Sequence, residues 1–248
     1  MPYLSFSEQT IADFSDKNID SLYSRGFLFT RVGKGHMYQT RSVRVDLSKF
    51  ELSSENRRVL KKTEELLLKT TPLPHPAYDW HIHKMGHDFY KTKFGEKTFT
   101  ANKLKELMTE EKNNFNLLLS YTVIPAQAGI QTTVDLDSHF RGDDNRGSVG
   151  YCICFETPEL LHYCYPFYDI RDSGSAIPNI GLGMMLRAII WSKEQGKKYV
   201  YLGSASRPSD TYKLQFAGVQ WWDGARWSSN IEFLKSNLKI KNLHNFPF

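Results

Sequence analysis

The sequence predicts an α+β protein in which helices flank a mixed, mainly antiparallel sheet. Three apolar stretches, 116–123, 148–156 and 160–168, read as consecutive antiparallel strands. Residues 182–195 then repeat apolar side chains at the 3.6-residue period of a helix, and 198–202 form a short apolar run typical of a buried strand. A meander of strands followed by a helix and one more strand predicts a single sheet with helical cover.

Length and composition set broad limits on the class of protein. The chain has 248 residues, enough to bury a substantial core in one large domain or two small ones. Its formal net charge of +5 permits nucleic-acid binding without requiring it. We expect a cytoplasmic protein, because the sequence has neither a long apolar span nor the pattern of a signal peptide. The three cysteines lack metal-type spacing, which predicts reduced thiols.

The first 70 residues predict a basic module made of a hairpin and a helix. Apolar and polar residues alternate on both sides of Gly33 and Gly35, a hairpin signal. Ser53 or Ser54 can cap the helix that follows. Residues 21–66 hold ten Lys or Arg and five Asp or Glu, so their net charge of +5 equals that of the whole chain.

The predicted helix separates its charged side chains from its apolar ones. The charged arc consists of Arg57, Arg58, Lys61 and Lys62. The apolar arc is predicted to include Val59, Leu60, Leu66 and Leu67. Concentrated positive charge suits contacts with a phosphate backbone, and a solvated helix face without a partner is the alternative.

Two glycines lie where the central helix begins. Gly181 and Gly183 would let a phosphate or a carbonyl approach free backbone N–H groups at the positive end of the helix. This arrangement resembles the acyltransferase core of the GNAT superfamily, in which the helix N-terminus holds a pyrophosphate or an acyl donor. Three residues before the first glycine, that family usually has Gln or Arg, and Pro178 stands here instead. The difference argues against ordinary coenzyme A binding.

A second set of motifs resembles the arginyl- and leucyl-tRNA–protein transferases, the enzymes of the N-degron pathway. The C-terminal motifs are YDIRDSGSAIPNIGLG, YLG, YKLQF and DGARW. The N-terminal motifs are Arg25-Gly26-Phe27, Tyr38, Arg44-Val45 and Arg57-Arg58-Val59. They cover about 21–66 and 160–227, and their order and spacing agree with the family. The family's cysteine cluster between the Tyr and Arg-Val motifs is missing, which excludes metal or iron–sulfur binding at that place.

The resemblance implies an aminoacyltransferase on a GNAT-like fold. Such an enzyme moves arginine or leucine from charged tRNA to the amine of a protein N-terminus. Its partners would be aminoacyl-tRNA and a protein or peptide N-terminus, with no membrane and no cofactor. Because the donor ester is already activated, the site needs only to hold the amine and the ester together, accept a proton and stabilise an oxyanion.

The resemblance also suggests roles for individual residues. As catalytic candidates, Asp169 could pair with the acceptor ammonium or the donor amine, and Gln215 could orient the amine or the carbonyl. The substrate-binding candidates are Tyr168, Gly181, Gly183, Tyr212 and Lys213. The tRNA-binding candidates are Arg25, Arg44, Arg57, Arg58, Lys61 and Lys62. A purely structural role is the alternative for Asp169, Tyr212 and Lys213. We expect Trp221, Trp222 and Trp227 in the core, with stacking on the terminal adenine as the alternative for one of them.

The rest of the chain supports a division into two parts, 1–70 as the basic module and 71–248 as the transferase domain. His81, His83 and His87 have a spacing that metal ligands can adopt, but no Cys or acidic residue completes the set, so we predict no metal site. Residues 124–147 are polar and aperiodic, which predicts a disordered insertion at a hairpin tip. Short helices are predicted from Ser7 onward and over 102–118.

Two other functions remain open at this point. The glycines at 181 and 183 also fit an N-acyltransferase that uses an acyl-CoA, although Pro178 and the basic module argue against it. A non-catalytic binder of tRNA or of protein N-termini is the second alternative, because the cysteine cluster is missing.

Overall fold

A computed structural model describes residues 5–96, 98–123, 147–170 and 177–240 of the chain. The predicted insertion at 124–147 therefore lies outside the described residues, except for Gly147. Within the described ranges, no helix is long and apolar enough to cross a membrane.

The core of the fold is an eight-stranded sheet with the order β11-β10-β4-β9-β8-β7-β6-β5. All neighbouring strands are antiparallel except β8 and β9. The strands are β4 (Ser42–Asp46), β5 (Leu66–Pro72), β6 (Leu117–Val123), β7 (Ser148–Glu156), β8 (Leu160–Tyr168), β9 (Tyr199–Ser204), β10 (Val219–Trp222) and β11 (Trp227–Ser228). This mostly antiparallel sheet with helical cover confirms the predicted α+β class.

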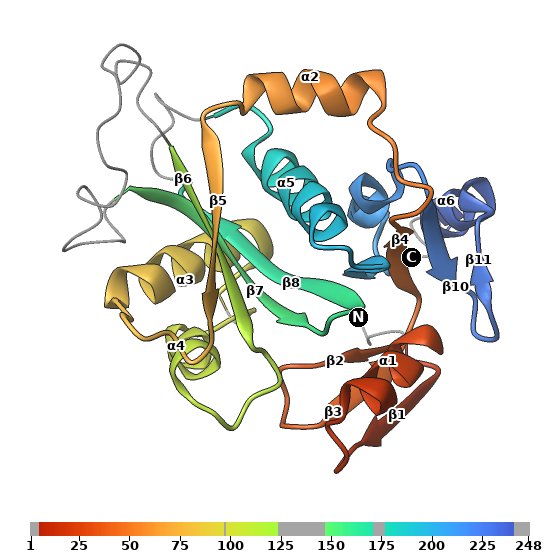
Figure 1. Cartoon of the computed structure of the whole chain (residues 1–248), viewed down its shortest axis with the longest axis horizontal. Helices are drawn as coiled ribbons and strands as arrows, with labels where there is room; N and C mark the ends of the chain where they lie inside the picture. The colour runs from red at the N-terminus through yellow and green to blue at the C-terminus, as the bar shows by residue number, and fades with distance from the viewer. Residues whose placement is uncertain (1–4, 97, 124–146, 171–176, 241–248) are drawn as a thin grey trace, which may run out of the picture.

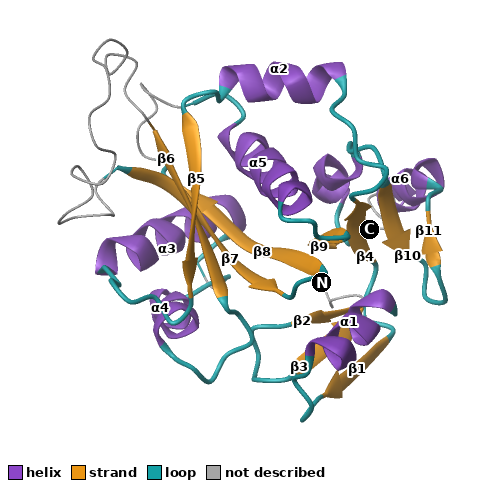
Figure 2. Cartoon of the chain, viewed as in Figure 1, coloured by secondary structure: helices purple, strands orange, loops and turns teal. Residues whose placement is uncertain are grey.

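Helices cover both faces of this sheet (Figures 1 and 2). On one face, α5 (Ile180–Glu194) packs with α2 (Ser54–Lys62) and α6 (Ile231–Ile240) in one apolar cluster. On the other face, α1 (Asp16–Ser24), α3 (Trp80–Phe94) and α4 (Ala101–Thr109) share a second cluster. The order β6, β7, β8, α5, β9 is the GNAT-like arrangement that the sequence predicts, because α5 joins two parallel strands.

The N-terminal segment folds into the predicted hairpin and helix. Strands β2 (Phe27–Phe29) and β3 (His36–Gln39) pair in antiparallel fashion on either side of the glycine loop. Asn114 holds that loop, because its side chain accepts from Gly35 N at 2.6 Å and donates to the Gly33 carbonyl at 2.7 Å. Ser53 caps α2 by accepting from Asn56 N at 3.1 Å, as its position predicts.

Three predicted helical segments are corrected by the structure. Residues from Ser7 form strand β1 (Ser7–Thr10), which pairs with β3. Helix α4 ends at Thr109, before the predicted end at residue 118, and the residues from Leu117 belong to β6. Helix α2 ends at Lys62, so Leu66 and Leu67 lie in strand β5 rather than on the apolar arc of the helix. In each case a strand partner far away in sequence decided the outcome, which local periodicity does not report.

The large sheet crosses the predicted division at residue 70. Strands β4 and β5 come from the first 72 residues, and they pair with β9, β10 and β6 from later in the chain. The basic module therefore shares one hydrogen-bonded sheet with the rest of the protein. A functional division between 1–70 and 71–248 stays a prediction.

Candidate active site

The parallel strands β8 and β9 pair over only part of their length. Their ladder joins Leu160 to Tyr199 and ends with His162 opposite Tyr201. Beyond that point β8 continues to Tyr168 and β9 to Ser204 without a common ladder. We call this region the parted end of the two strands, and the paired stretch the sealed end. Strand edges that leave a ladder offer backbone groups to other partners.

A β-bulge marks the start of the parted end. The register between β7 and β8 passes from Ile153 opposite Tyr165 to Cys154 opposite Tyr163, so Cys164 has no partner residue on β7. Bulges of this kind re-aim a strand and are common beside active sites. One carbonyl of the parted stretch has a side-chain partner, because the Tyr90 hydroxyl of α3 donates to Pro166 O at 3.0 Å. No local sequence pattern predicts this bulge, since it depends on the pairing of β8 with β7.

Helix α5 begins beside the end of β8. A Cβ atom added to Gly181 would lie 3.1 Å from Cε1 of Tyr168, so the first turn of the helix touches that ring. Asn179 precedes the helix in a left-handed conformation with φ 65°. The Asn179 carbonyl accepts from the amides of Leu182 at 3.0 Å and Gly183 at 2.9 Å. The Gly183 amide is thus part of the first helical turn, and the predicted ligand contact through it is not available in this structure.

Gly183 has a packing role instead. A Cβ atom at this position would lie 2.7 Å from both Cγ2 and Oγ1 of Thr63, the residue that ends α2. A guanidinium N–H of Arg187 donates to the Thr63 carbonyl from the same side of α5. The missing side chain at Gly183 therefore lets the C-terminal end of α2 meet the N-terminal turn of α5.

This contact places the basic helix next to the parted end. Figure 1 shows α2 lying across α5, at the edge of the molecule. All four charged candidates on α2 are exposed: Arg57, Arg58, Lys61 and Lys62. The Arg58 guanidinium pairs with Glu55 at 2.6 Å, and this pair raises the pKa of Arg58 and lowers that of Glu55. Part of the positive charge of the helix is thus balanced within its own first turns.

The short helix η2 (Pro208–Leu214) lies beside the end of β9. Lys213 Nζ donates to Ser204 O at 2.7 Å and pairs with Asp210 at 3.2 Å. Its side chain is only 12% exposed, so Lys213 braces the end of β9. A direct contact between Lys213 and a phosphate would require this pair to open, which makes the structural alternative the better description of the residue.

Tyr212 of η2 is an exposed residue whose hydroxyl stays protonated at neutral pH. Burial, with the nearby Asp210 carboxylate as a smaller cause, raises the pKa of the Tyr212 hydroxyl to about 12. The residue as a whole is nevertheless 46% exposed, so part of its side chain faces solvent. Burial also raises the pKa of Tyr168, and Tyr212 contributes to that shift, so the two phenols lie near each other.

The two catalytic candidates lie on different elements around this region. Asp169 directly follows β8, is half-buried, and donates its backbone N–H to Val149 O at 3.0 Å. Gln215 follows η2 and is exposed. Its side-chain amide donates to Tyr212 O at 2.7 Å, which ends the short helix. Whether either residue acts in a reaction stays a prediction.

Arg44 is a correction to the predicted tRNA contacts. Its side chain is buried, with the guanidinium carbon 4.0 Å from the ring centres of both Tyr199 and Trp227. Nε donates to Gln220 Oε1 at 2.9 Å. Aromatic rings and an amide thus hold the charge inside the fold, and a phosphate cannot reach it.

Arg25 is exposed, but it lies far from the basic helix. It ends α1, and Figure 1 shows α1 and α2 on opposite sides of the molecule. The adjacent Gly26 has φ 81°, and a Cβ atom there would lie 2.4 Å from Cγ of Trp222. The Arg-Gly-aromatic motif is thus explained by close packing. Trp221 and Trp222 are buried as predicted, and half-buried Trp227 donates from Nε1 to Ser24 O at 2.7 Å.

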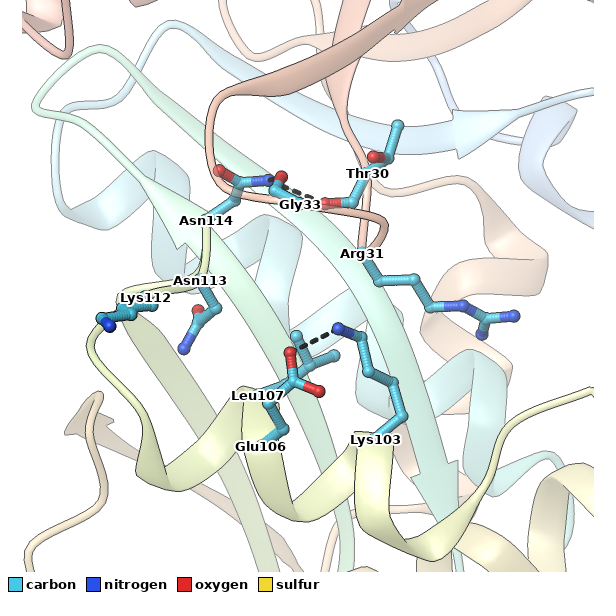
Figure 3. Close-up of a pocket in the computed structure, with 9 residues that line it drawn as sticks. All are labelled: Thr30, Arg31, Gly33, Lys103, Glu106, Leu107, Lys112, Asn113 and Asn114. Carbon is cyan, nitrogen blue, oxygen red and sulfur yellow. Dashed lines mark hydrogen bonds and ion pairs between the residues drawn. The ribbon is translucent and has the colours of Figure 1, made fainter. Parts of the chain in front are cut away.

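Two pockets occur elsewhere on the molecule. Figure 3 shows the smaller, where Thr30 and Gly33 of the hairpin loop face the Lys103–Glu106 ion pair of α4. Its volume of about 10 Å³ has room for roughly one water. The larger is an open groove of about 520 Å³ beside α1 and the end of β7. Neither is lined by residues of α5 or η2, so neither belongs to the parted end.

The chemistry of metals and thiols finds little support in the described residues. Within them, no group of three or more His, Cys, Asp or Glu could hold a metal ion. The three cysteines are free. Burial raises the pKa of Cys152 and of Cys164 well above the usual value, which keeps both thiols protonated and unreactive.

Comparisons with known proteins give distant similarities only. No family model matches the chain, and no curated protein matches its sequence. L-PGS from Bacillus licheniformis is 13% identical with a TM-score of 0.42, over 77% of this chain and 52% of that one. A GCN5-related glucosamine N-acetyltransferase region of a fungal β-N-acetylglucosaminidase is 12% identical with a TM-score of 0.42, over 89% and 23%. FemX is 10% identical with a TM-score of 0.41, over 77% and 60%. The chain thus spans about half the length of the first of these structures.

Proposed function

We propose that this protein is an aminoacyltransferase that moves arginine or leucine from charged tRNA to the amine of a protein N-terminus. The observation that carries the proposal is the parting of β8 and β9 beyond His162 and Tyr201, next to the first turn of α5. The basic helix α2 ends against that same turn at Thr63. A region with open strand edges and a neighbouring cationic helix suits a substrate that combines an ester with RNA.

The reaction needs one nucleophilic step and no covalent enzyme intermediate. The acceptor nitrogen attacks the ester carbon, an N–C bond forms, and the C–O bond to the terminal ribose breaks. Asp169 accepts the proton that the amine loses and passes it to the leaving ribose oxygen, so no net proton is taken up. An α-amino group has a pKa of about 8, so part of it is already neutral at physiological pH.

Two phenols suit the developing negative charge, Tyr168 next to Asp169 in the sequence and Tyr212 on η2. Tyr212 has a pKa of about 12, and burial raises that of Tyr168, so both hydroxyls stay protonated at neutral pH. A protonated hydroxyl in a partly desolvated region can donate to the oxyanion of the tetrahedral intermediate. Gln215, next to Tyr212, would orient the carbonyl or the amine. In this mechanism Lys213 braces η2 and does not contact the substrate.

The test is direct transfer. The full chain is incubated with tRNA charged with radiolabelled arginine or leucine, and with peptides that begin with an acidic or a basic residue. We expect label in the peptide with one donor–acceptor combination, and no label when the peptide N-terminus is acetylated. Turnover of acetyl-CoA without tRNA would replace the proposal by an acyl-CoA-dependent acyltransferase. Tight tRNA binding without any product would replace it by a non-catalytic binder.

A further inference from the structure

We propose that Phe94, Arg207 and Tyr212 form a stacking surface that binds the unpaired 3′ end of an RNA. We call these three residues the aromatic rim. The inference rests on the proposed function in one respect only: it takes tRNA as the RNA in question. The motifs discussed for the sequence include Tyr212 but neither Phe94 nor Arg207.

Phe94 is an apolar residue held out in solvent at the last position of α3. Phe94 is 49% exposed. The inner side of the ring is anchored, since Tyr90 stacks on it with centroids 5.9 Å apart and Phe89 meets it edge-on at 6.4 Å. Gly95, with φ 93°, ends the helix directly after it. The ring is thus fixed in orientation while about half of the residue remains open.

Arg207 connects this ring to η2. Its guanidinium carbon lies 5.8 Å from the centre of the Phe94 ring, and the residue is exposed. Asp210 fixes the backbone beneath it by accepting from Arg207 N at 2.8 Å, and the carboxylate pairs with Lys213. Among the described residues no acidic side chain forms an ion pair with Arg207. The guanidinium is carried by an exposed residue and can be reached by a ligand.

Tyr212 completes the rim from the other side. The residue is 46% exposed, so part of its ring is open to solvent. Arg207 caps η2 and Tyr212 lies within it, so the short helix that brings the guanidinium to Phe94 also carries the Tyr212 ring to the same surface. That surface begins at Tyr168, whose ring meets Phe89 at 4.7 Å, and so it borders the parted end of β8 and β9.

Two exposed aromatic residues and an exposed guanidinium match the chemistry of single-stranded nucleic acid. Bases stack on aromatic faces in a manner that tolerates any sequence, and arginine both stacks on bases and pairs with phosphates in a bidentate way. A base-paired stem cannot use such a surface, because its bases already stack on one another. The rim therefore predicts a preference for unpaired nucleotides, and its place beside the parted end predicts a 3′ end.

The experiment compares two RNA hairpins with the same stem, one carrying a four-nucleotide 3′ tail and one blunt, both uncharged and fluorescently labelled. Binding is measured by anisotropy with the wild type and with Phe94→Leu, Arg207→Gln and Tyr212→Leu. The matched controls are Phe233→Leu, an aromatic that is 55% exposed on α6, and Arg226→Gln, whose side chain is 86% exposed. Melting curves by circular dichroism confirm that each variant folds.

We expect each rim variant to bind the tailed hairpin about tenfold more weakly, from the loss of one stacking or charged contact. The affinity of each rim variant for the blunt hairpin should stay within about twofold of the wild-type value. Both control variants should bind both hairpins within the same limit. Tyr212→Phe should bind like the wild type, because it keeps the ring. Equal affinity of the wild type for both hairpins, equal losses on both, or no loss at all would each overturn the inference.

The outcome is separable from that of the proposed function. If amino-acid transfer occurs but the rim variants bind the tailed hairpin normally, the rim inference is wrong and the enzyme assignment stands. If the wild type binds the tail through the rim but no amino acid is transferred, the rim is right and the enzyme assignment is wrong.

Discussion

The two ends of the β8–β9 pair use the same strands for opposite purposes. At the sealed end, Leu160 to His162 pair with Tyr199 to Tyr201, and the buried His162 ring meets the Tyr23 hydroxyl at 2.9 Å. At the parted end the ladder stops, a bulge interrupts β8, and the Tyr90 hydroxyl of α3 donates to Pro166 O at 3.0 Å. The closed ladder fixes the spacing of β8 and β9, and beyond it each strand is held by its outer neighbour, β7 or β4.

The two ends show that buried and exposed polar side chains have different roles in this protein. His162 and Arg44 are enclosed by aromatic rings, and they add specificity to the packing of the core. Tyr212 and Arg207 are exposed, and they are free to meet a ligand. The predictions below ask whether stability resides at the sealed end and activity at the parted end.

The largest expected effect is on the stability of the sealed end at low pH. Burial, helped by the charge of Lys213, lowers the pKa of His162 from 6.5 to about 3. Between these values the unfolded chain binds a proton that the folded chain does not, so the free energy of unfolding falls as the pH decreases from 6.5 towards 3. The slope from this group is about 1.4 kcal/mol per pH unit, and above pH 6.5 it contributes none.

Urea unfolding at several pH values between 7 and about 4 measures this slope. In His162→Gln, the free energy of unfolding should depend less steeply on pH, by about 1.4 kcal/mol per pH unit, because glutamine does not titrate. An identical pH dependence of stability for the wild type and the variant would show that the acid sensitivity comes from another group. The sealed end would then not be the source of this stability.

The second prediction concerns activity at the parted end. Asp169→Asn should lower the rate of amino-acid transfer by about a hundredfold, the effect of losing a general base. Asp20→Asn is the matched control, because Asp20 is a half-buried carboxylate at the sealed end that accepts from Thr157 Oγ1 at 2.8 Å. We expect the control to transfer at the wild-type rate. Equal activity of Asp169→Asn and the wild type would remove Asp169 from the mechanism.

The third prediction tests the basic helix beside the parted end. Replacing Arg57, Arg58, Lys61 and Lys62 by Gln should weaken tRNA binding by about tenfold or more at low salt. The slope of log affinity against log salt concentration should become shallower by about two to three, since each lost phosphate contact reduces its magnitude by about 0.9. The control replaces four exposed lysines scattered elsewhere, namely Lys17, Lys49, Lys112 and Lys198. A similar loss in both quadruple variants would mean that only the net charge matters.

The fourth prediction concerns the packing contact where α2 meets α5, which should affect stability and not the chemistry. Gly183→Ala would bring a methyl group to 2.7 Å from Thr63, which should lower the free energy of unfolding by about 1–3 kcal/mol. Gly33→Ala is the control, because its Cβ would have no heavy atom within 4 Å. Adding Thr63→Gly to Gly183→Ala should recover part of the loss. Additive losses in the double variant would contradict a direct contact.

Much of the local structure could be predicted because it depends on neighbouring residues. The capping of α2 by Ser53, the hairpin around Gly33 and Gly35, and the helix over 182–195 all follow from spacing within one or two turns. The three strands 117–123, 148–156 and 160–168 follow from apolar runs bounded by turns. The α+β class could then be inferred from the order of these elements.

The candidate site was less predictable, because burial and pairing depend on contacts between distant segments. Arg44 and Arg57 both occur in basic motifs, yet Arg44 is buried between Tyr199 and Trp227 while Arg57 is exposed. Gly183 was expected to offer its amide, and it serves instead to bring Thr63 close. No local pattern distinguishes these outcomes.

The sequence by itself determined the elements, their order and the concentration of positive charge in residues 21–66, since these depend on residue type and short-range spacing. Only the tertiary structure decided where β8 and β9 separate, which cations stay exposed, and that Arg207 meets Phe94. Those features arise from a sheet that joins residues more than a hundred positions apart, and the free energy of such contacts is not written in any single stretch of the chain.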